Sequence, residues 1–386
     1  MTAFALTPEQ ESFAASVRSI AATQLRPLAE AGQSGRVNRE LIKTMGSLGL
    51  LARLFPGIGA GSPLDEAAPL SREAAATGLC LLRESLATQS TEAETALALQ
   101  GLGSYPVLQS GRDELVRRWL PAVAAGDAVA AFALSEPSAG SDAAALALAA
   151  ERDGNGWRLT GEKTWISNAP EADFYTVFAR TTPGAGARGV SAFLVPADRP
   201  GLTGSHLDML SPHPIGTLVF DGVPVHAGEL LGEVDHGFRV AMRTLDLFRP
   251  SVGAFAVGMA QAALDASVAH AGAREAFGGP LRDQQAVSHL LAEMATRVSA
   301  ARLLVYAAAA AYDDGSPGIT AKAAMAKLFS TETAQFVVDS AVQIHGARAL
   351  QRGHLLEHLY REVRAPRIYE GTSEIQRTII ARELYR

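Results

Sequence analysis

The sequence predicts an α+β protein of several domains, in which a β part lies between two helical parts. With 386 residues the chain is longer than one hydrophobic core usually organises, so two or three domains are expected. Apolar residues recur three and four positions apart at both ends of the chain, whereas short apolar runs separated by Gly and Pro fill the middle. We therefore expect an all-helical N-terminal domain over residues 1–126, a middle β domain over 127–235 and a C-terminal helical bundle over 236–386.

Helical spacing in the first part begins at Thr7 and continues to about Ala125. Pro8 suits the first turn of a helix. The stretch Pro56-Gly57-Ile58-Gly59-Ala60-Gly61 predicts a break between helices. Pro121, which follows the apolar run 115–120, is expected to end the last long helix of this part.

The middle part contains a strong hairpin signal. Asp153-Gly154-Asn155-Gly156 separates residues 146–151 from residues 157–160, and such a turn joins two antiparallel strands. Residues 174–179, 190–196 and 217–220 read as further short strands between Gly and Pro loops. A domain of such strands indicates a small barrel or sandwich.

Helical spacing returns after residue 236. Long helices are expected over residues 249–271 and 319–345. Between them, one apolar stripe is traced by Val287, Leu290, Leu291, Met294, Val298 and Val305. Many alanines permit close helix packing, so a bundle is the expected architecture.

Composition excludes several classes of function. The net charge of −6 and the pI of about 5.9 argue against binding to a nucleic-acid backbone, which requires an excess of Lys and Arg. The one cysteine, Cys80, cannot form an internal disulfide, and a reducing compartment fits this. The nine histidines form no His-Glu-x-x-His motif or close pair, so we predict no metal site.

The sequence also predicts where the protein resides. Its first residues lack a basic lead followed by an apolar core, and they carry acids, which transit peptides avoid. The longest apolar stretches, 252–264 and 303–312, are too short to span a bilayer. We expect a soluble, cytoplasmic protein.

The stretch of residues 368–375 places one carboxylate at a joint between helices. Glu370 lies after Pro366 and directly before Gly371, so its side chain can point into a cavity. Ser373 and Gln376 fit a Ser-x-x-Gln capping pair, which predicts that a helix begins beside Glu370. Backbone donors at that helix start could hold an electron-rich ligand against the carboxylate. Taken alone, the stretch is better explained as an ordinary capped turn on the surface.

Two segments of the middle part have the composition of a ligand site. The segment 131–142 reads Ala-Phe-Ala-Leu-Ser-Glu-Pro-Ser-Ala-Gly-Ser-Asp, and its small residues and hydroxyls can line a flat polar heterocycle. In Lys163-Thr164-Trp165-Ile166-Ser167-Asn168-Ala169, Trp165 offers a stacking face and Ser167 a hydroxyl. A connecting loop and a tryptophan that fills the core are the commoner explanations of such segments.

Together, in this order, these segments and Tyr369-Glu370-Gly371-Thr372 resemble the acyl-CoA dehydrogenase family of flavoenzymes. The resemblance covers nearly the whole chain. It continues through Leu245-Asp246-Leu247-Phe248-Arg249, Arg274-Glu275-Ala276-Phe277-Gly278, Gln285-Ala286-Val287, Gln343-Ile344-His345-Gly346 and Ile379-Ile380-Ala381-Arg382. Each motif alone is weak, but so many in the family's order indicate membership.

The resemblance implies a helical N-terminal domain, a middle β-barrel or sandwich domain and a C-terminal four-helix bundle, assembled as a homotetramer that binds FAD. Residues matching those around the flavin ring are Phe132, Leu134, Ser135, Ser141, Trp165, Ile166 and Ser167, with Ser167 at the N5 edge and Ser135 on the pyrimidine side. Residues matching those that contact the FAD of a neighbouring subunit are Arg274, Phe277, Gln285, Gln343, Gly346 and Ala347, while Thr372 and Glu374 match further cofactor contacts. Residues matching the family's substrate contacts are Ser141, Asp246, Arg249, Tyr369 and Gly371.

By the same resemblance, Glu370 is the catalytic base. It would remove the α-proton of an acyl-CoA thioester while the β-hydride passes to flavin N5, giving a trans-2-enoyl-CoA and passing electrons to an electron-transfer flavoprotein. The backbone N–H of this Glu and a flavin ribityl hydroxyl would donate to the thioester carbonyl. Some relatives place the base beside the arginine that Arg249 matches, but that neighbour here is Phe248, which is expected to shape the acyl pocket.

The chain departs from the family pattern at three places, one of which is Gly353-His354-Leu355-Leu356, where relatives have a Pro-containing stretch. Gly346-Ala347-Arg348-Ala349 stands where relatives often have Gly-Gly-x-Gly, which puts contacts with the adenosine half of FAD in doubt. The Pro56–Gly61 stretch replaces a Gly-Gly pair that helps to close the substrate cavity in relatives.

Other functions on the same scaffold stay open. An oxidase, a flavin monooxygenase or a dehydrogenase of a carrier-protein thioester would share the fold, although the retained Glu370 favours desaturation of acyl-CoA. A flavin-containing binding protein, for instance for DNA, is disfavoured by the acidic composition.

Overall fold

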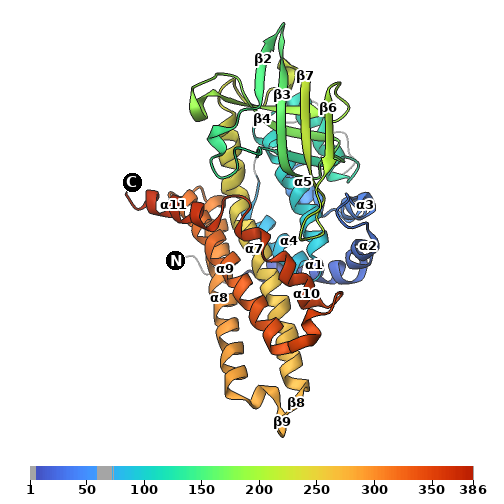
Figure 1. The fold of residues 1–386 in the computed structure, drawn as a ribbon, viewed down its shortest axis with the longest axis vertical. Helices are drawn as coiled ribbons and strands as arrows, with labels where there is room; N and C mark the ends of the chain where they lie inside the picture. Colours follow the sequence, from blue (N-terminus) through green and yellow to red (C-terminus); the bar gives the residue numbers. More distant parts are fainter. Residues whose placement is uncertain (1–5, 59–71, 73, 386) are drawn as a thin grey trace. The chain divides into compact units, whose positions relative to one another are not determined.

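The computed structural model describes residues 6–58, 72 and 74–385. The chain forms two compact units, drawn as a ribbon in Figure 1. The first unit comprises Met1–Arg26, Ala76–Glu94 and Asp246–Arg386, and the second comprises Pro27–Ala75 and Thr95–Leu245.

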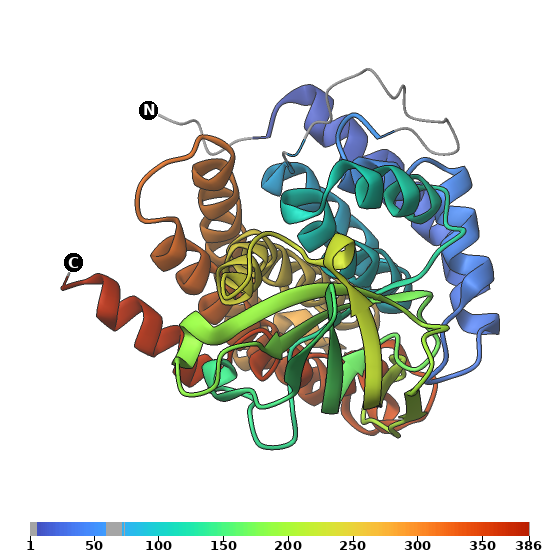
Figure 2. The same cartoon turned by 90° about the horizontal axis from the view of Figure 1, so that it is seen from above.

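The first unit is helical. Its helices are α1 (Pro8–Ile20), α4 (Ala76–Ala87), α8 (Gln285–Asp313), α9 (Ile319–His345), α10 (Leu355–Glu362) and α11 (Ser373–Glu383), together with the first turn of α5 (Thr91–Ser110) and most of α7 (Gly237–Ala273). A short hairpin, β8 (Glu275–Ala276) with β9 (Gly279–Pro280), lies between α7 and α8 in sequence. Figures 1 and 2 both show α11, which leads to the C-terminus, extending sideways from the long helices α8 and α9.

Small residues allow the long helices to pack closely. A Cβ atom added at Gly253 of α7 would lie only 2.7 Å from Cγ2 of Val305 in α8. One added at Gly258 would lie 2.5 Å from the carbonyl oxygen of Glu84 in α4. Both glycines therefore let α7 approach its neighbours more closely than any larger side chain would.

The predicted helices of this unit agree with the structure. The helix expected over residues 319–345 is α9, and the one expected over 249–271 lies within the longer α7. In the predicted stripe of α8, Met294, Val298 and Val305 are buried, whereas its first three members are only half-buried. The stripe thus faces the core from Met294 onward.

Among the described residues, α7 alone is long and apolar enough to cross a membrane. In its most apolar 18-residue window, 72% of the residues are buried inside the protein, as expected for the core helix of a globular protein.

The second unit contains a mixed sheet. Its strands are β1 (Ala130–Ala133), β2 (Ala149–Asp153), β3 (Gly156–Ser167), β4 (Phe174–Arg180), β5 (Val190–Pro196), β6 (Leu202–His206) and β7 (Ile215–His226). They lie in the order β1-β4-β2-β3-β7-β6, and β5 pairs with β4. Its helices are α2 (Arg26–Ala31), which begins at the unit's edge, α3 (Arg39–Ser47), α6 (Asp113–Ala124) and the rest of α5.

The predicted hairpin is confirmed, because β2 and β3 are antiparallel and Asp153 pairs with Gly156 across a two-residue turn. Strand β5 has the predicted bounds, and β4 and β7 extend beyond theirs. Two strands were not predicted. β1 is three-quarters alanine, which is a weak strand former, and β6 consists of half-buried and exposed residues at the edge of the sheet.

In the N-terminal part, the sequence predicts a helix end at Pro121 and a break between helices at Pro56–Gly61. Pro121 does not end its helix, because α6 continues to Ala124 and buries Leu120, Val123 and Ala124. The packing of these side chains outweighs the one backbone hydrogen bond that the proline removes. Of the predicted break at Pro56–Gly61, residues 59–61 lie outside the described part of the chain.

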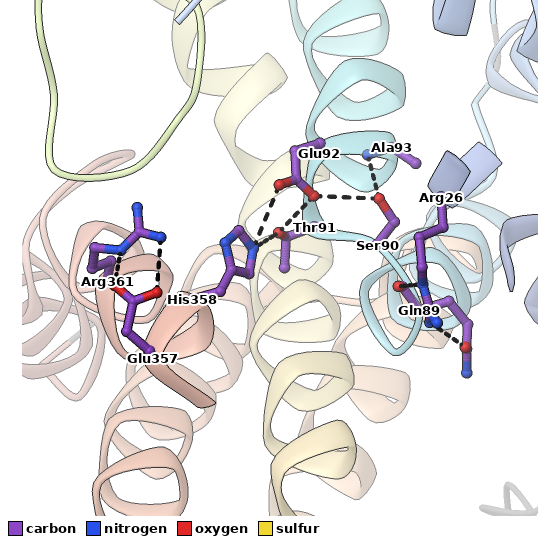
Figure 3. Close-up of polar contacts among 9 residues, drawn as sticks. All are labelled: Arg26, Gln89, Ser90, Thr91, Glu92, Ala93, Glu357, His358 and Arg361. Atoms are coloured by element: carbon purple, nitrogen blue, oxygen red, sulfur yellow. Dashed lines mark hydrogen bonds and ion pairs between the residues drawn. The ribbon is translucent and has the colours of Figure 1, made fainter. Parts of the chain in front are cut away.

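Side chains at the start of α5 hold neighbouring elements of the first unit in place (Figure 3). His358 of α10 approaches Thr91 at 2.6 Å, from Nε2 to Oγ1, and Arg26 donates from Nε to the Gln89 carbonyl at 2.7 Å. The end of the segment between α4 and α5 is therefore held by Arg26, and the first residue of α5 is held by His358 of α10.

Candidate active site

Glu370 lies in a left-handed turn between a short helical turn, Ala365–Arg367, and α11. Its φ is +53°, and that of the following Gly371 is +93°. A left-handed conformation is unfavourable for a residue with a side chain by roughly 1–2 kcal/mol, so the surrounding structure must hold it.

Three side chains hold this turn by its two carbonyl groups. Gln376 donates from Nε2 to the Glu370 oxygen at 3.1 Å and to the Gly371 oxygen at 2.9 Å. Arg249 donates from Nε to the Glu370 oxygen at 3.3 Å, and Lys327 donates from Nζ to the Gly371 oxygen at 2.6 Å. We call these three side chains the carbonyl clamp. The clamp requires glycine at position 371, because a Cβ there would lie 2.7 Å from Nε2 of Gln376.

The helix after the turn is capped differently from the prediction. Thr372 is the N-cap, and its Oγ1 accepts from the backbone N–H of Ile375 at 3.3 Å. Ser373 instead donates to Oε1 of Glu332 at 2.6 Å, and Gln376 belongs to the carbonyl clamp. The predicted Ser373–Gln376 capping pair is therefore wrong, since a hydroxyl one residue earlier already satisfies the helix start.

The Glu370 carboxyl group lies in surroundings that favour its protonated form. Its Oε2 is buried and has no hydrogen-bond partner within the described residues. Burial raises the pKa of the Glu370 carboxyl, and the positive charges of Arg83, Lys327 and Arg249 oppose that rise. A carboxylate in such surroundings is a stronger base than one in water.

A buried ion pair in the same unit carries one of these charges. Arg83 of α4 bonds to Glu94 of α5 through Nε and donates from Nη1 to Oγ of Ser251 at 2.7 Å. All three residues are almost completely buried. We did not predict Arg83 or Glu94 as site residues, although an arginine within the apolar run 79–87 is a signal of a buried polar site.

The predicted substrate residues of this unit lie around the turn. Asp246 accepts at Oδ2 from the Thr320 hydroxyl at 3.2 Å, and its Oδ1 lies 3.5 Å from Nη1 of Arg249. Burial raises the pKa of Asp246, while Arg249 opposes that rise. Arg249 thereby connects Asp246 to the Glu370 carbonyl, next to Tyr369 and Gly371 in the chain.

In the second unit, two predicted flavin segments are joined to each other. The backbone N–H of Thr164 donates to the Ser135 carbonyl at 3.0 Å. Lys163, which is fully buried, donates from Nζ to the Leu134 carbonyl at 2.9 Å and pairs with Glu136 at 2.8 Å. These contacts bring the segments 131–142 and 163–169 side by side.

Trp165 is not a core side chain. It has a φ of +55° and 51% of its surface is exposed, whereas Trp157 in the same strand is 3% exposed and fills the core. Strain and exposure together are typical of a residue kept for binding rather than for packing. Its indole is thus available as a stacking face.

The other predicted ring contacts fall into two groups. Leu134 and Ile166 are buried, and the Phe132 ring packs 4.9 Å from that of Phe178. The hydroxyls of Ser135, Ser141 and Ser167 make no hydrogen bond within the described residues. Three hydroxyls are therefore left free to bond a ligand.

The residues predicted to contact a neighbouring subunit's cofactor are exposed in the first unit. Phe277 has a φ of +54° and is 93% exposed, and Arg274 and Arg348 line one cavity of about 340 Å³ with His270. The remaining members are all exposed, namely Gln285, Gln343, Gly346 and Ala347. Of the two further contacts, Thr372 caps α11 and Glu374 is exposed in its first turn. The structure therefore brings Arg274 and the segment of Gly346 and Ala347 to one end of the bundle.

The polar cluster in Figure 3 is a different kind of site. The same nitrogen of His358, Nε2, faces both Thr91 Oγ1 at 2.6 Å and Glu92 Oε1 at 3.6 Å. A catalytic triad needs opposite ring nitrogens to contact the nucleophile and the acid. The cluster is therefore structural, and it anchors α10 to the start of α5.

Known proteins identify the family. Sequence profiles described as the N-terminal, middle and C-terminal domains of acyl-CoA dehydrogenases match residues 7–127, 131–223 and 235–385. The chain belongs to the acyl-CoA dehydrogenase family. The predicted family and fold class are thus confirmed, and the chain is an oxidoreductase that acts on acyl-CoA.

Individual known proteins resemble the chain along nearly its whole length. The mitochondrial short-chain specific acyl-CoA dehydrogenase of Bos taurus is 40% identical over 95% of this chain and 88% of that protein. The structure of butyryl-CoA dehydrogenase from Megasphaera elsdenii is 32% identical, with a TM-score of 0.91 over 100% of both chains. The structure of PigA with FAD and proline is 28% identical, with a TM-score of 0.91 over 100% of this chain and 99% of that one.

The cofactor of this acyl-CoA dehydrogenase is FAD, as membership of the family and the FAD-bound PigA structure support. The residues present fit a flavin. An exposed Trp165 and the unbonded hydroxyls of Ser135 and Ser167 provide an aromatic face and hydrogen-bonding groups on adjoining segments.

Proposed function

We propose that the chain catalyses α,β-dehydrogenation of an acyl-CoA thioester to the trans-2-enoyl-CoA, with Glu370 as the base. The observation that carries this proposal is the buried, unpartnered Oε2 of Glu370, which lies among three cationic side chains in a strained turn. A buried carboxylate without a partner, in a turn held by three side chains, is the arrangement expected of a general base.

Each part of the turn has a function in the proposed reaction. The Glu370 carboxylate removes the proton from the α carbon, and its raised pKa makes that proton easier to accept. The backbone N–H of Glu370, which makes no hydrogen bond within the described residues, donates to the thioester carbonyl as negative charge develops there. Bound FAD supplies the two-electron oxidant that takes the hydride from the β carbon.

The finer assignments belong to the same proposal. The proposed contacts to the flavin ring are Phe132, Leu134, Ser135, Ser141, Trp165, Ile166 and Ser167. The proposed contacts to the FAD of a neighbouring subunit are Arg274, Phe277, Gln285, Gln343, Gly346 and Ala347. The further proposed cofactor contacts are Thr372 and Glu374. Ser141, Asp246, Arg249, Tyr369 and Gly371 contact the acyl-CoA. We further propose the three predicted domain ranges, a homotetramer, a cytoplasmic location and an electron-transfer flavoprotein as electron acceptor.

Glu370→Gln tests the base directly. The amide has the same shape but cannot take the proton, so we expect the variant to bind FAD and fold normally while flavin reduction by acyl-CoA falls by at least about a thousandfold. The measurement is anaerobic bleaching of the flavin absorbance in a stopped-flow instrument, with a panel of short, branched, cyclic and aromatic acyl-CoAs. Reduction of the variant at the rate of the unsubstituted enzyme would exclude Glu370 as the base.

The same flavin signal separates the dehydrogenase from an oxidase. After reduction by acyl-CoA, air is admitted, and slow reoxidation is expected for a dehydrogenase that delivers electrons to a protein acceptor. Reoxidation at the rate of turnover would favour the oxidase.

A further inference from the structure

Lys327 is an unusual residue because it is charged and yet completely buried. It lies in the first half of α9 with 0% of its surface exposed, directly after buried alanines at 323, 324 and 326. Its ammonium group makes one hydrogen bond, to the Gly371 carbonyl at 2.6 Å. No carboxylate lies within 4.0 Å of it among the described residues. Burial of an ammonium group without such a partner is costly.

The hydrogen bond alone does not explain why the lysine is there. The Gly371 carbonyl already accepts from Gln376 at 2.9 Å, so it would remain bonded without Lys327. What Lys327 adds is a positive charge beside the turn and a third point of attachment, reached from α9. Gln376 belongs to α11, and Arg249 belongs to α7, so each member of the carbonyl clamp comes from a different helix.

We propose that Lys327 is a positioning residue for the dehydrogenation, which fixes the Glu370–Gly371 turn to α9 and keeps the Glu370 carboxylate charged. The proposal rests on the proposed role of Glu370 as the base. On this view Lys327 is present for the reaction, because burial of its charge does not favour folding.

Charge in the surroundings supports this role. The charged groups that act on Glu370 are Arg83 of α4, Arg249 of α7 and Lys327 of α9. Those that act on Lys327 are Glu370, Arg249, Glu332 of α9 and Glu374 of α11. Burial lowers the pKa of Lys327 to about 8, and the Glu370 charge is the largest of the effects that oppose this. The ammonium therefore loses its proton around pH 8.

The effect of Lys327 on the free energy of unfolding distinguishes a residue that positions the base from one that the fold requires. Because folding lowers the pKa of Lys327 from its ordinary 10.5 to about 8, the unfolded chain binds the additional proton between these values. The lysine thus makes folding less favourable below pH 8 than above pH 10.5. Lys327→Met, which keeps the length and removes the charge, should not lower thermal stability at pH 7.

The experiment compares Lys327→Met with Thr331→Val as a matched control. Thr331 is buried one turn further along α9 and donates from Oγ1 to the Lys327 carbonyl at 2.9 Å, within its own helix rather than to the turn. The measurements are flavin reduction by acyl-CoA from pH 5.5 to 9.5 and the melting temperature of the FAD-bound enzyme. Lys327→Gln is the second variant if Lys327→Met yields no folded protein.

We expect Lys327→Met to reduce flavin roughly tenfold to a hundredfold more slowly at pH 7, because a small displacement of the base has effects of that size. At the acid end of the pH profile, the rise in the rate of flavin reduction should move to higher pH, because a cation that favours the charged Glu370 carboxylate is lost. At the alkaline end, the fall in rate that deprotonation of Lys327 causes above pH 8 in the unsubstituted enzyme should disappear. The melting temperature of Lys327→Met should be equal or higher, whereas Thr331→Val should keep the rate and the pH profile of the unsubstituted enzyme.

Two results would overturn the role of Lys327. One is an unchanged rate and pH profile in Lys327→Met while Glu370→Gln is inactive. The other is a rate loss that matches a loss of thermal stability, as for a residue needed only for folding. Normal flavin reduction in Glu370→Gln would instead refute the proposed base, so the two failures are distinguishable.

Discussion

At the scale of single residues, backbone strain marks the proposed site. Five described residues other than glycine have a positive φ, namely Trp165, Asn168, Asp235, Phe277 and Glu370. Three of them, Trp165, Phe277 and Glu370, are residues that the sequence assigns to flavin or substrate. A left-handed backbone at a bulky residue persists only where the surroundings enforce it. The strain thus gives physical support to assignments that came from motif resemblance.

The pair of Arg83 and Glu94 is expected to control the charge of Glu370, and opposite variants should move its titration in opposite directions. Arg83→Met removes a cation and leaves a buried anion, so the acid limb of flavin reduction should move to higher pH. Glu94→Gln frees the full charge of Arg83, so the limb should move to lower pH. Stopped-flow rates against pH measure both.

Stability provides the control for this pair. Breaking a buried ion pair from one side costs about 3–5 kcal/mol, so Arg83→Met should lower the urea midpoint strongly. The double variant Arg83→Met/Glu94→Gln should recover much of that loss because it leaves no unpaired charge. Shifts of both single variants in the same direction would show that the pair does not act on Glu370 through charge.

At the scale of elements, the close contact of α7 with α8 is expected to tolerate no added atom. Gly253→Ala would place a methyl group 2.7 Å from Cγ2 of Val305, and overpacking of this kind costs about 1–3 kcal/mol. Gly272→Ala in the same helix meets nothing within 4 Å and should be neutral or slightly stabilising. Denaturant unfolding of both variants compares them directly. Val305→Ala combined with Gly253→Ala should restore stability, and a failure to do so would place the strain elsewhere.

Elements differ in how far the sequence could predict them. The bounds of α9 and β5 were predicted correctly, because long apolar periodicity and a short apolar run between glycine and proline loops are strong local signals. Strand β6 is polar and lies at an edge of the sheet, so no local signal reveals it. In the site, the place of Glu370 at a joint follows from Pro366 and Gly371, and its assigned role follows from the family resemblance. Arg83 and Lys327, in contrast, come from two distant helices, α4 and α9. Tertiary packing brings them near Glu370, and no single segment of the sequence predicts that packing.

At the scale of the whole molecule, FAD should stabilise the folded chain, because a ligand that binds only the folded state adds free energy of unfolding. The gain is about 2.7 kcal/mol when free FAD is at a hundred times its Kd. Trp165→Ala removes an exposed side chain that fills no core, so the melting temperature of the FAD-free protein should stay unchanged. The increase in melting temperature on adding FAD should shrink, because the stacking face is lost. Trp157→Ala is the contrasting variant, since loss of this buried ring should lower the melting temperature with or without FAD. If Trp165→Ala lowers the FAD-free melting temperature as much as Trp157→Ala does, then Trp165 serves the core rather than the cofactor.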